Sequence, residues 1–389
     1  MASTRSTRAI VDLACLERNW QRLRTVHAQG RLMTVLKANA YGHGMLPVAR
    51  FLAGLGQALF AVALLDEALA LRAAGIAGRI LVLGPPEPGS LPLYARHGIE
   101  ATLASLPHVR EALAAGAGEA LPVHLKVDTG MGRIGLREED APALRELLRG
   151  QSALAVRAVC SHFADVEQLG SDFCETQHAR FERWCDRLAE ALPGRRLERH
   201  LANSAGLLRD RRFHFDYARV GFALWAPLRF DPPARAPAAA AAQEPVLSLR
   251  TRVTHVKTVQ PGDSVGYGRT YRAASPEVIA TLPVGYGDGY FRALSNRGAV
   301  LLGGKRRPIV GRVSMDQITV SLGGEACRIG EEAILIGPAP GAEAGPAAAP
   351  ITVAELGAWA GTNDYEVLTS VAARVPRIYV RDGTPVPEP

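Results

Sequence analysis

Short apolar runs alternate with amphipathic stretches through the first 221 residues of the chain. The runs cover residues 32–37, 59–64, 79–84, 99–104, 123–128, 154–162, 198–203 and 216–221. Because they are short, continuous and bounded by turn-forming residues, they predict buried β-strands. The stretches between them, such as 65–75 and 174–192, repeat their apolar residues every three or four positions, which predicts amphipathic helices.

Eight strands that alternate with helices within about 200 residues predict an α/β fold, a (β/α)₈ TIM-like barrel. A doubly wound parallel sheet stays open as the alternative, because periodicity does not show whether a sheet closes. A further strand-like run at residues 8–13 precedes the alternating pattern. This first strand could join the C-terminal domain instead of the barrel.

The pattern changes after residue 230. Residues 230–245 are rich in proline and alanine and have neither helical nor strand periodicity, so they predict a linker. Beyond them, alternating apolar and polar segments are separated by Pro-Gly, Gly-Asp and Gly-Gly turns, which is typical of an antiparallel β domain. We therefore expect a barrel at 1–233, a linker at 234–245 and a mainly β C-terminal domain at 246–389.

Composition narrows the class of protein. At 389 residues and 48% hydrophobic side chains, the chain can bury the cores of two domains. Its net charge of +7 comes from scattered arginines without a basic run, so we expect no nucleic-acid partner. Five cysteines without a C-x-x-C pair indicate neither a disulfide framework nor a metal site. The N-terminus lacks an apolar core of signal-peptide length, and no stretch approaches ~18 apolar residues, so we expect a cytoplasmic protein without a membrane partner.

Lys37 ends the first apolar run of the predicted barrel and precedes small, turn-prone residues. Only four of the 45 basic residues are lysines, namely Lys37, Lys126, Lys257 and Lys305. A chain that otherwise uses arginine keeps a lysine where an amine must lose its proton, as in imine formation. A solvated lysine at a strand end is the alternative interpretation.

Other reactive side chains follow the same ends of the predicted strands. Barrel enzymes place their active sites at the carboxyl ends of the strands, and there the sequence has Arg133, His162, Asn203–Ser204 and Arg219–Phe222. The loops after strands seven and eight often bind a phosphate, and Ser204 and Gly221 suit that use. A lysine that forms an imine, opposite a phosphate site, suggests pyridoxal phosphate as the cofactor.

Nine segments in both predicted domains resemble, in order, the signatures of bacterial alanine racemases. They are KANAYGHG (37–44), KVDTGMGRIG (126–135), SHFA (161–164), HLANSAG (200–206), RVGFALW (219–225), VGYGRTY (265–271), LPVGYGDG (282–289), VSMDQ (313–317) and NDYEVLT (363–369). The resemblance implies a pyridoxal-phosphate enzyme that interconverts L- and D-alanine, either supplying D-alanine for peptidoglycan or degrading it. It also implies a head-to-tail homodimer with shared active sites.

The resemblance assigns two catalytic bases. Lys37 would form the imine with the cofactor and act on one face of the α-carbon, and Tyr267 would act on the opposite face. A tyrosine with an ordinary pKa near ~10 needs help to act as a base, and the resemblance offers His162 and Arg219 as its neighbours. Without the resemblance, Tyr267 would be interpreted as an ordinary turn tyrosine and His162 as a core histidine.

The resemblance assigns the remaining site residues to cofactor and substrate. Arg219 would face the pyridine nitrogen and, because it keeps its proton, would leave the ring a weaker electron sink. Arg133 would contact the cofactor's phenolic oxygen and the substrate carboxylate. Lys126 matches a lysine that some members carry as a carbamate. The phosphate-side residues would be Tyr41, Ser204, Gly221, Phe222 and Tyr365, and Asn203 would also bind the cofactor. The residues near the substrate would be Tyr286, Met315 and Asp316.

Two other functions stay open at this point. One is a pyridoxal-phosphate amino-acid decarboxylase of similar architecture, which Arg219 disfavours because it takes the place of a ring-nitrogen carboxylate. The other is a non-enzymatic pyridoxal-phosphate carrier, which the complete β domain with its own tyrosine disfavours.

Overall fold

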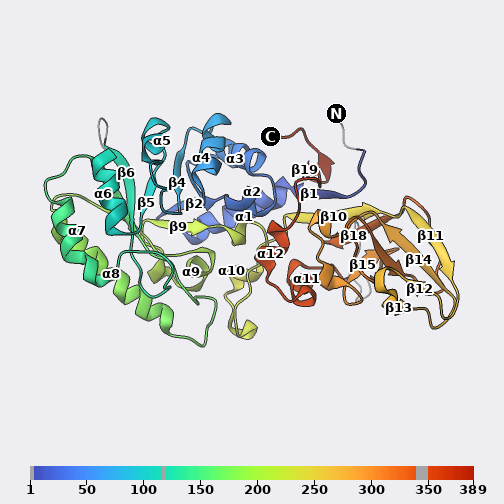
Figure 1. The fold of residues 1–389 in the computed structure, drawn as a ribbon. Coiled ribbons are helices and arrows are strands. Elements are labelled where there is room, and N and C mark those ends of the chain that lie inside the picture. Colours follow the sequence, from blue (N-terminus) through green and yellow to red (C-terminus); the bar gives the residue numbers. More distant parts are fainter. Residues whose placement is uncertain (1–3, 116–119, 339–348) are drawn as a thin grey trace. The chain divides into compact units, whose positions relative to one another are not determined.

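The computed structural model describes residues 4–115, 120–338 and 349–389 (Figure 1). The chain divides into two compact units. The first, the β unit, holds the N-terminal residues as far as Cys15, the short segment Tyr41–Gly44 and the chain from Pro245 onward; the second, the barrel unit, holds Leu16–Ala40 and Met45–Glu244. Each unit is described by itself.

Every apolar run predicted to be a barrel strand contains a strand. In the described part of the barrel unit these are β2 Arg31–Val35, β3 Leu59–Val62, β4 Arg79–Val82, β5 Ala101–Leu103, β6 Leu121–Lys126, β7 Leu154–Cys160, β8 Glu198–His200 and β9 Tyr217–Val220. They pair in parallel in two groups of four, in the orders β4-β3-β2-β9 and β5-β6-β7-β8. Most of their residues are buried, as expected for parallel strands covered on both faces.

Backbone hydrogen bonds join the two groups at both junctions. Between β4 and β5, the amide of Glu100 donates to the Ile80 carbonyl at 2.8 Å, and the Val82 amide donates to the Glu100 carbonyl at 3.0 Å. Between β8 and β9, the Arg219 amide donates to the Ala202 carbonyl at 3.0 Å. The strands therefore close into a barrel, which confirms the predicted fold class. The doubly wound alternative is wrong, because an open sheet would leave these edges unpaired.

Helices follow the strands in sequence and pack through their apolar faces. Apart from the short segment α2 Lys37–Tyr41, the described helices of this part of the chain are α1 Leu13–Val26, α3 Met45–Gly54, α4 Leu65–Ala73, α5 Leu91–Arg96, α6 Leu106–Ala115, α7 Ala141–Leu148, α8 Phe173–Ala191, α9 Ser204–Arg209 and α10 Ala238–Ala241. In α8 the buried residues include Phe181, Trp184 and Leu188, whose three- and four-residue spacing is the helical period that the sequence predicts.

The segment predicted to be a structureless linker forms part of the barrel unit as far as Glu244. It contains helix α10, where Ala240 is fully buried and its carbonyl accepts a hydrogen bond from the Leu228 amide. The side chain of Asn19 donates to the Glu244 carbonyl at 2.7 Å and accepts from the Glu244 amide at 2.8 Å. Alanine has a high helix propensity, so four alanines in a row form a turn of helix once they pack on a surface.

The β unit is built on a seven-stranded sheet with the order β16-β15-β18-β10-β1-β19-β20, beside a three-stranded sheet β11-β14-β17 and the hairpin β12-β13. Its strands are β1 Arg8–Asp12, β10 Leu247–Arg252, β11 His255–Val259, β12 Ser264–Val265, β13 Tyr271–Arg272, β14 Glu277–Leu282, β15 Ala299–Leu302, β16 Lys305–Pro308, β17 Ile318–Ser321, β18 Glu332–Ile336, β19 Arg377–Arg381 and β20 Thr384–Pro385. Strand β1 lies between β10, to which it is antiparallel, and β19, to which it is parallel.

Two helices in the described residues accompany the sheets of the β unit. They are α11 Val353–Ala360 and α12 Asp364–Thr369. Asn363 caps α12 by accepting a hydrogen bond from the Glu366 amide at 2.9 Å. No helix in the described ranges combines the length and the hydropathy that crossing a bilayer requires.

Candidate active site

Lys37 lies two residues beyond Val35, the last residue of β2, at the carboxyl end of this barrel strand. The Leu36 amide still pairs with the Ala61 carbonyl of the neighbouring strand at 2.8 Å. The next four residues, 38–41 in the short helical segment α2 Lys37–Tyr41, are not glycine, yet their φ angles lie between 52° and 54°. Left-handed backbone is unfavourable for such residues and persists where the surroundings impose it, often at functional sites.

Glu67 of α4, which the sequence analysis missed, holds this backbone in place. One carboxylate oxygen accepts from the Ala38 amide at 2.7 Å, and the other accepts from the amides of Ala63 at 2.8 Å and Leu64 at 3.2 Å. A single side chain thereby ties together the ends of β2 and β3. A glutamate in the first turn of a helix is a recognisable capping signal, but its bond to Ala38 depends on tertiary structure.

The surroundings of Lys37 favour its neutral amine. Partial burial is the main cause that lowers the pKa of Lys37 from 10.5, and the positive charges of Arg133 and Arg219 lower it further, while Glu67 opposes them. The neutral amine is the nucleophilic form of lysine. The residue keeps an exposed surface, and what distinguishes it from an ordinary lysine at a strand end is the nearby positive charge of Arg133 and Arg219.

Arg219 of β9 is a buried cation that contacts no carboxylate among the described residues. Its two terminal nitrogens donate to the backbone carbonyls of His200 at 2.9 Å, Ser161 at 2.7 Å and Leu201 at 3.0 Å, and to Nδ1 of His200 at 2.8 Å and of His162 at 3.1 Å. Within the described ranges, its Nε–H has no partner. One donor of a fixed guanidinium is therefore available to a ligand.

His162 is neutral. Burial, followed by the positive charges of Arg219, Lys126 and Arg133, lowers the pKa of His162 well below 6.5. Because an arginine only donates, Nδ1 of His162 accepts the bond from Arg219, and the proton lies on Nε2. His162 is thus a neutral imidazole with an N–H donor on its other side.

Lys126, the last residue of β6, is only 9% exposed. Burial is the largest cause that lowers the pKa of Lys126 to about 7, with the charges of Arg219 and Arg133 adding to it and Cys160 opposing it. No hydrogen bond or ion pair reaches its amine from the part of the chain that the structure describes. A buried lysine without a partner is costly, which makes it a candidate for a chemical role.

Arg133 lies in the loop after β6, which Asp128 organises. The Asp128 carboxylate accepts from the amides of Gly130 at 2.9 Å and Gly132 at 3.1 Å, and both glycines have positive φ. The guanidinium of Arg133 is exposed and makes no ion pair with any described residue. It can therefore bind an external carboxylate through two donors.

The predicted phosphate-side residues divide between the two units. In the barrel unit, the hydroxyl oxygen of Ser204 accepts from the amides of Gly221 at 2.9 Å and Ala223 at 3.3 Å, so its own hydrogen can be donated to a ligand. Asn203 caps α9 by accepting from the Gly206 amide at 2.8 Å, and Phe222 is buried. In the β unit, the rings of Tyr41 and Tyr365 lie 6.2 Å apart between centroids.

Apart from Arg133, the residues predicted near the substrate belong to the β unit. The Tyr286 amide donates to the Ser314 carbonyl at 3.0 Å, which places Tyr286 next to the loop with Met315 and Asp316. Arg374, a residue that the sequence analysis missed, donates to the Met315 carbonyl at 3.2 Å and to the Asp316 carboxylate at 2.8 Å.

Tyr267 lies on a turn between two glycines with positive φ, Gly266 and Gly268. Asn296 links this turn to Gly311, because it donates to the Thr270 hydroxyl at 3.1 Å and accepts from the Gly311 amide at 2.6 Å. The Tyr267 side chain is 74% exposed. Lys37 and Tyr267 belong to different units.

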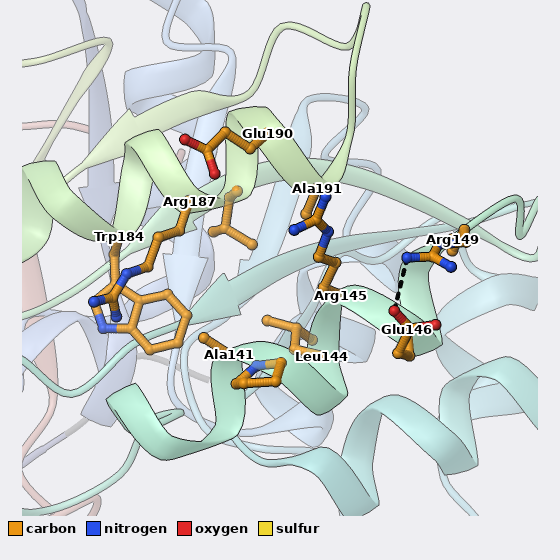
Figure 2. Close-up of a pocket in the computed structure, with 11 residues that line it drawn as sticks. Ala141, Leu144, Arg145, Glu146, Arg149, Trp184, Arg187, Glu190 and Ala191 are labelled. Atoms are coloured by element: carbon orange, nitrogen blue, oxygen red, sulfur yellow. Dashed lines mark ion pairs between the residues drawn. The ribbon is translucent and has the colours of Figure 1, made fainter.

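A separate surface hollow of about 500 Å³ lies between α7 and α8 (Figure 2). Leu144 and Arg145 line it from α7, and Trp184 and Arg187 line it from α8. None of the residues predicted for the site takes part in it. It is a groove between two helices and lies outside the candidate active site.

Family models match both parts of the chain. Residues 11–227 match the family described as "Alanine racemase, N-terminal domain", and residues 246–379 match "Alanine racemase, C-terminal domain". The chain is 39% identical over 383 residues to the alanine racemase of Carboxydothermus hydrogenoformans, covering 96% of this chain and 99% of the relative. It is 40% identical over 378 residues to that of Symbiobacterium thermophilum, covering 96% and 97%.

Solved structures of alanine racemases are similar to this chain over nearly its whole length. An alanine racemase from Bacillus anthracis with bound L-Ala-P is 36% identical and superposes with a TM-score of 0.90, covering 100% of this chain and 98% of that one. An alanine racemase from Bartonella henselae with covalently bound pyridoxal phosphate is 29% identical, with a TM-score of 0.85 and coverage of 96% and 99%.

Proposed function

Because the chain belongs to the alanine racemase family, as both matched domains and its full-length relatives show, we propose that it interconverts L-alanine and D-alanine with pyridoxal phosphate as cofactor. The observation that carries the proposal is the setting of Lys37. A lysine at a strand end, with a lowered pKa and two arginines nearby, is suited to form an imine.

The donors of the barrel unit fit the cofactor. The Lys37 amine suits an aldehyde, the unpartnered Nε–H of Arg219 suits a ring nitrogen that accepts a hydrogen bond, and the hydroxyl hydrogen of Ser204 suits a phosphate oxygen. When bound, pyridoxal phosphate holds the substrate's amino group and withdraws electrons from its α-carbon. Gly221, Phe222, Asn203, Tyr41 and Tyr365 are the other proposed cofactor-binding residues.

Lys37 and Tyr267 are the proposed proton carriers. Racemisation removes the hydrogen from one face of the α-carbon and returns a proton to the other face, so a base is needed on each side. Lys37 serves one face through its amine, and Tyr267 serves the other through its phenolic oxygen. His162, a neutral donor held by Arg219, is the proposed neighbour of the tyrosine.

Arg219 sets how strongly the ring attracts electrons. A guanidinium keeps its proton at any physiological pH, so Arg219 donates a hydrogen bond to the ring nitrogen without protonating it. A weaker electron sink favours returning a proton to the α-carbon over the more electron-demanding decarboxylation. An arginine at position 219 therefore supports a racemase over the decarboxylase alternative.

Arg133 is the proposed partner of the substrate carboxylate and of the cofactor's phenolic oxygen. We propose that Lys126 orients it as a carbamate, which forms when the neutral amine bonds to the carbon of CO₂ and releases one proton. The lowered pKa of Lys126 supports this, because only the neutral amine has the lone pair for that bond. The resulting anion would attract Arg133 instead of repelling it.

The β unit supplies the proposed entrance and the second base. Tyr286, Met315 and Asp316 would narrow the space around the substrate and favour a methyl side chain. Within the described residues, six large apolar side chains are exposed, and four of them are Tyr267, Tyr286, Met315 and Tyr365. Exposed apolar groups of this kind are typical of a surface that meets a partner.

These exposed side chains support a homodimer in which the β unit of one subunit faces the barrel of the other. Lys37 and Tyr267 of one active site would then come from different chains. We propose a cytoplasmic enzyme that supplies D-alanine for peptidoglycan, or degrades it.

Two measurements test the function. The purified holoenzyme, incubated separately with L-alanine and with other amino acids, is expected to form D-alanine without releasing carbon dioxide; carbon dioxide without a D-isomer would favour a decarboxylase. Borohydride reduction followed by peptide mapping is expected to leave a pyridoxyl group on Lys37. A label on Lys126, Lys257 or Lys305 would contradict the cofactor assignment.

A further inference from the structure

A chain of buried side chains runs from Arg219 through the barrel to a carboxylate. Nδ1 of His200 contacts Arg219 at 2.8 Å, Nε2 of His200 contacts Nδ1 of His124 at 2.8 Å, and Nε2 of His124 contacts Glu100 at 2.8 Å. Both histidines are fully buried, and Glu100 is 2% exposed. Of these four side chains, the proposed function uses only Arg219.

The chemistry of the partners fixes both tautomers. Arg219 only donates, so Nδ1 of His200 accepts and the proton of His200 lies on Nε2. That N–H must donate to Nδ1 of His124, so the proton of His124 also lies on Nε2. It donates to Glu100, which as a carboxylate only accepts. This single arrangement of protons satisfies all three side-chain hydrogen bonds between Arg219 and Glu100.

The charge states of His200 and Glu100 are consistent with this arrangement of protons. Burial, followed by the positive charge of Arg219, lowers the pKa of His200 well below 6.5, so the ring stays neutral. Burial alone would raise the pKa of Glu100, but hydrogen bonds from His124 and Arg79 outweigh it and lower the pKa to about 2. Glu100 is therefore ionised and is the fixed acceptor at the end of the chain.

The barrel architecture brings these residues together. His124 lies on β6 and His200 on β8, and alternate barrel strands contribute side chains to the same interior layer. Arg219 lies on β9, the strand next to β8. On the intervening β7, the residue paired with His124 is Ala158, whose small side chain leaves room for the two rings. At the far end, Arg79 donates to both carboxylate oxygens of Glu100, at 2.6 Å and 3.1 Å.

We propose that Glu100 and His124 are positioning residues for the racemase reaction: they fix the tautomer of His200 so that its lone pair faces Arg219 and holds the guanidinium with Nε–H directed at the ligand. This rests on the proposed function, because it gives Arg219 the role assigned there. A carboxylate in direct contact would neutralise the charge of Arg219. Two neutral imidazoles in between fix its position and leave that charge uncompensated.

The tautomers can be observed without activity. In the cofactor-free protein with ¹⁵N-labelled histidine, long-range proton–nitrogen correlation spectra are expected to show Nε2–H and an unprotonated Nδ1 for both His124 and His200 at neutral pH. Variants of each histidine assign the signals. An Nδ1–H tautomer or an imidazolium at either residue would overturn the proposal, whether or not the protein racemises alanine.

Two substitutions of Glu100 distinguish a role in positioning Arg219 from a contribution to stability alone. Glu100→Leu removes the acceptor of His124, so His200 is expected to populate both tautomers and kcat to fall about 10- to 100-fold, with KM for alanine changing less than about threefold. Glu100→Gln keeps one oxygen to accept from His124 but loses a bond to Arg79. It is expected to be less stable, to keep both tautomers and to retain kcat within about threefold.

Thr102→Val is the matched control for loss of a buried polar group in the same part of the barrel. Thr102 is 1% exposed and donates to the Val82 carbonyl at 2.6 Å. Strand pairing places it beside His124, but within the described residues its hydroxyl makes no hydrogen bond to either histidine. It is expected to lower the melting temperature and leave kcat and the tautomers unchanged. A Glu100→Leu protein that keeps the wild-type tautomers and kcat, or a Glu100→Gln protein that loses both, would overturn the proposal.

Discussion

Replacing Lys126 with methionine is expected to stabilise the protein, although the change lies within the candidate active site. Methionine has a similar length and flexibility but carries no charge. Lys126 is 9% exposed, and no described residue gives its amine a hydrogen bond or an ion pair to replace lost hydration. The folded chain therefore holds this lysine at a cost that the unfolded chain does not have.

The lowered pKa gives the size of this cost. Moving the pKa of Lys126 from 10.5 to about 7 corresponds to roughly 4–5 kcal/mol of unfolding free energy. The penalty is fully present below the folded-state pKa of about 7, shrinks as the pH rises, and is absent above the unfolded-state value of 10.5. After an allowance of about 1–2 kcal/mol for imperfect packing of methionine, the variant should gain roughly 3 kcal/mol at neutral pH.

Urea unfolding of the cofactor-free protein in buffer without carbon dioxide tests this. Tryptophan fluorescence reports mainly on the barrel, because Trp20, Trp184 and Trp225 lie there. The stability gain of Lys126→Met should be large at pH 7 and small near pH 10. Added bicarbonate should stabilise the wild type and not the variant, because a carbamate removes the buried cation.

The matched control is Lys305→Met. Lys305 has a side chain that is 53% exposed and forms an ion pair with Glu325 at 3.0 Å, so its replacement should change the unfolding free energy by less than about 1 kcal/mol. If Lys126→Met is less stable than the wild type at pH 7, or if its effect does not depend on pH, the assignment of a buried neutral amine is wrong.

Three further outcomes follow from the site. Glu67→Ala should lose about 1–3 kcal/mol of unfolding free energy in urea and lower kcat, because the amides of Ala38 and Ala63 lose their acceptor. An unchanged kcat would mean that the hydrogen bonds of Glu67 do not position Lys37. Ser204→Ala should raise the cofactor dissociation constant about tenfold in fluorescence titrations, and an unchanged constant would argue against the phosphate assignment. Mixing inactive Lys37→Ala and Tyr267→Phe proteins under conditions that allow subunit exchange should restore about a quarter of wild-type activity through hybrid dimers, and no recovery would contradict shared active sites.

The barrel could be predicted because buried parallel strands appear in the sequence as short continuous apolar runs. The same pattern located Lys37, Lys126 and Arg219 at or near strand ends. The sequence does not show the setting of Lys37, since its lowered pKa depends on Arg133 and Arg219, which are distant in sequence.

Features that depend on tertiary structure could not be predicted from the sequence. The left-handed turn at residues 38–41 contains no glycine, so its composition gives no sign of positive φ. The alanine-rich segment looked unstructured because its helix depends on packing against the barrel. The chain from Glu100 to Arg219 joins residues on strands that only barrel closure brings together, so no local pattern predicts it.

The central claim is that Lys37 and Tyr267 act on opposite faces of the same α-carbon. It is tested most directly by α-hydrogen exchange of the Tyr267→Phe holoenzyme in deuterium oxide, measured separately from L-alanine and from D-alanine. We expect interconversion to be lost while exchange persists from one enantiomer, through the intact lysine. Equal residual exchange from both enantiomers, or undiminished racemisation, would contradict the two-base account.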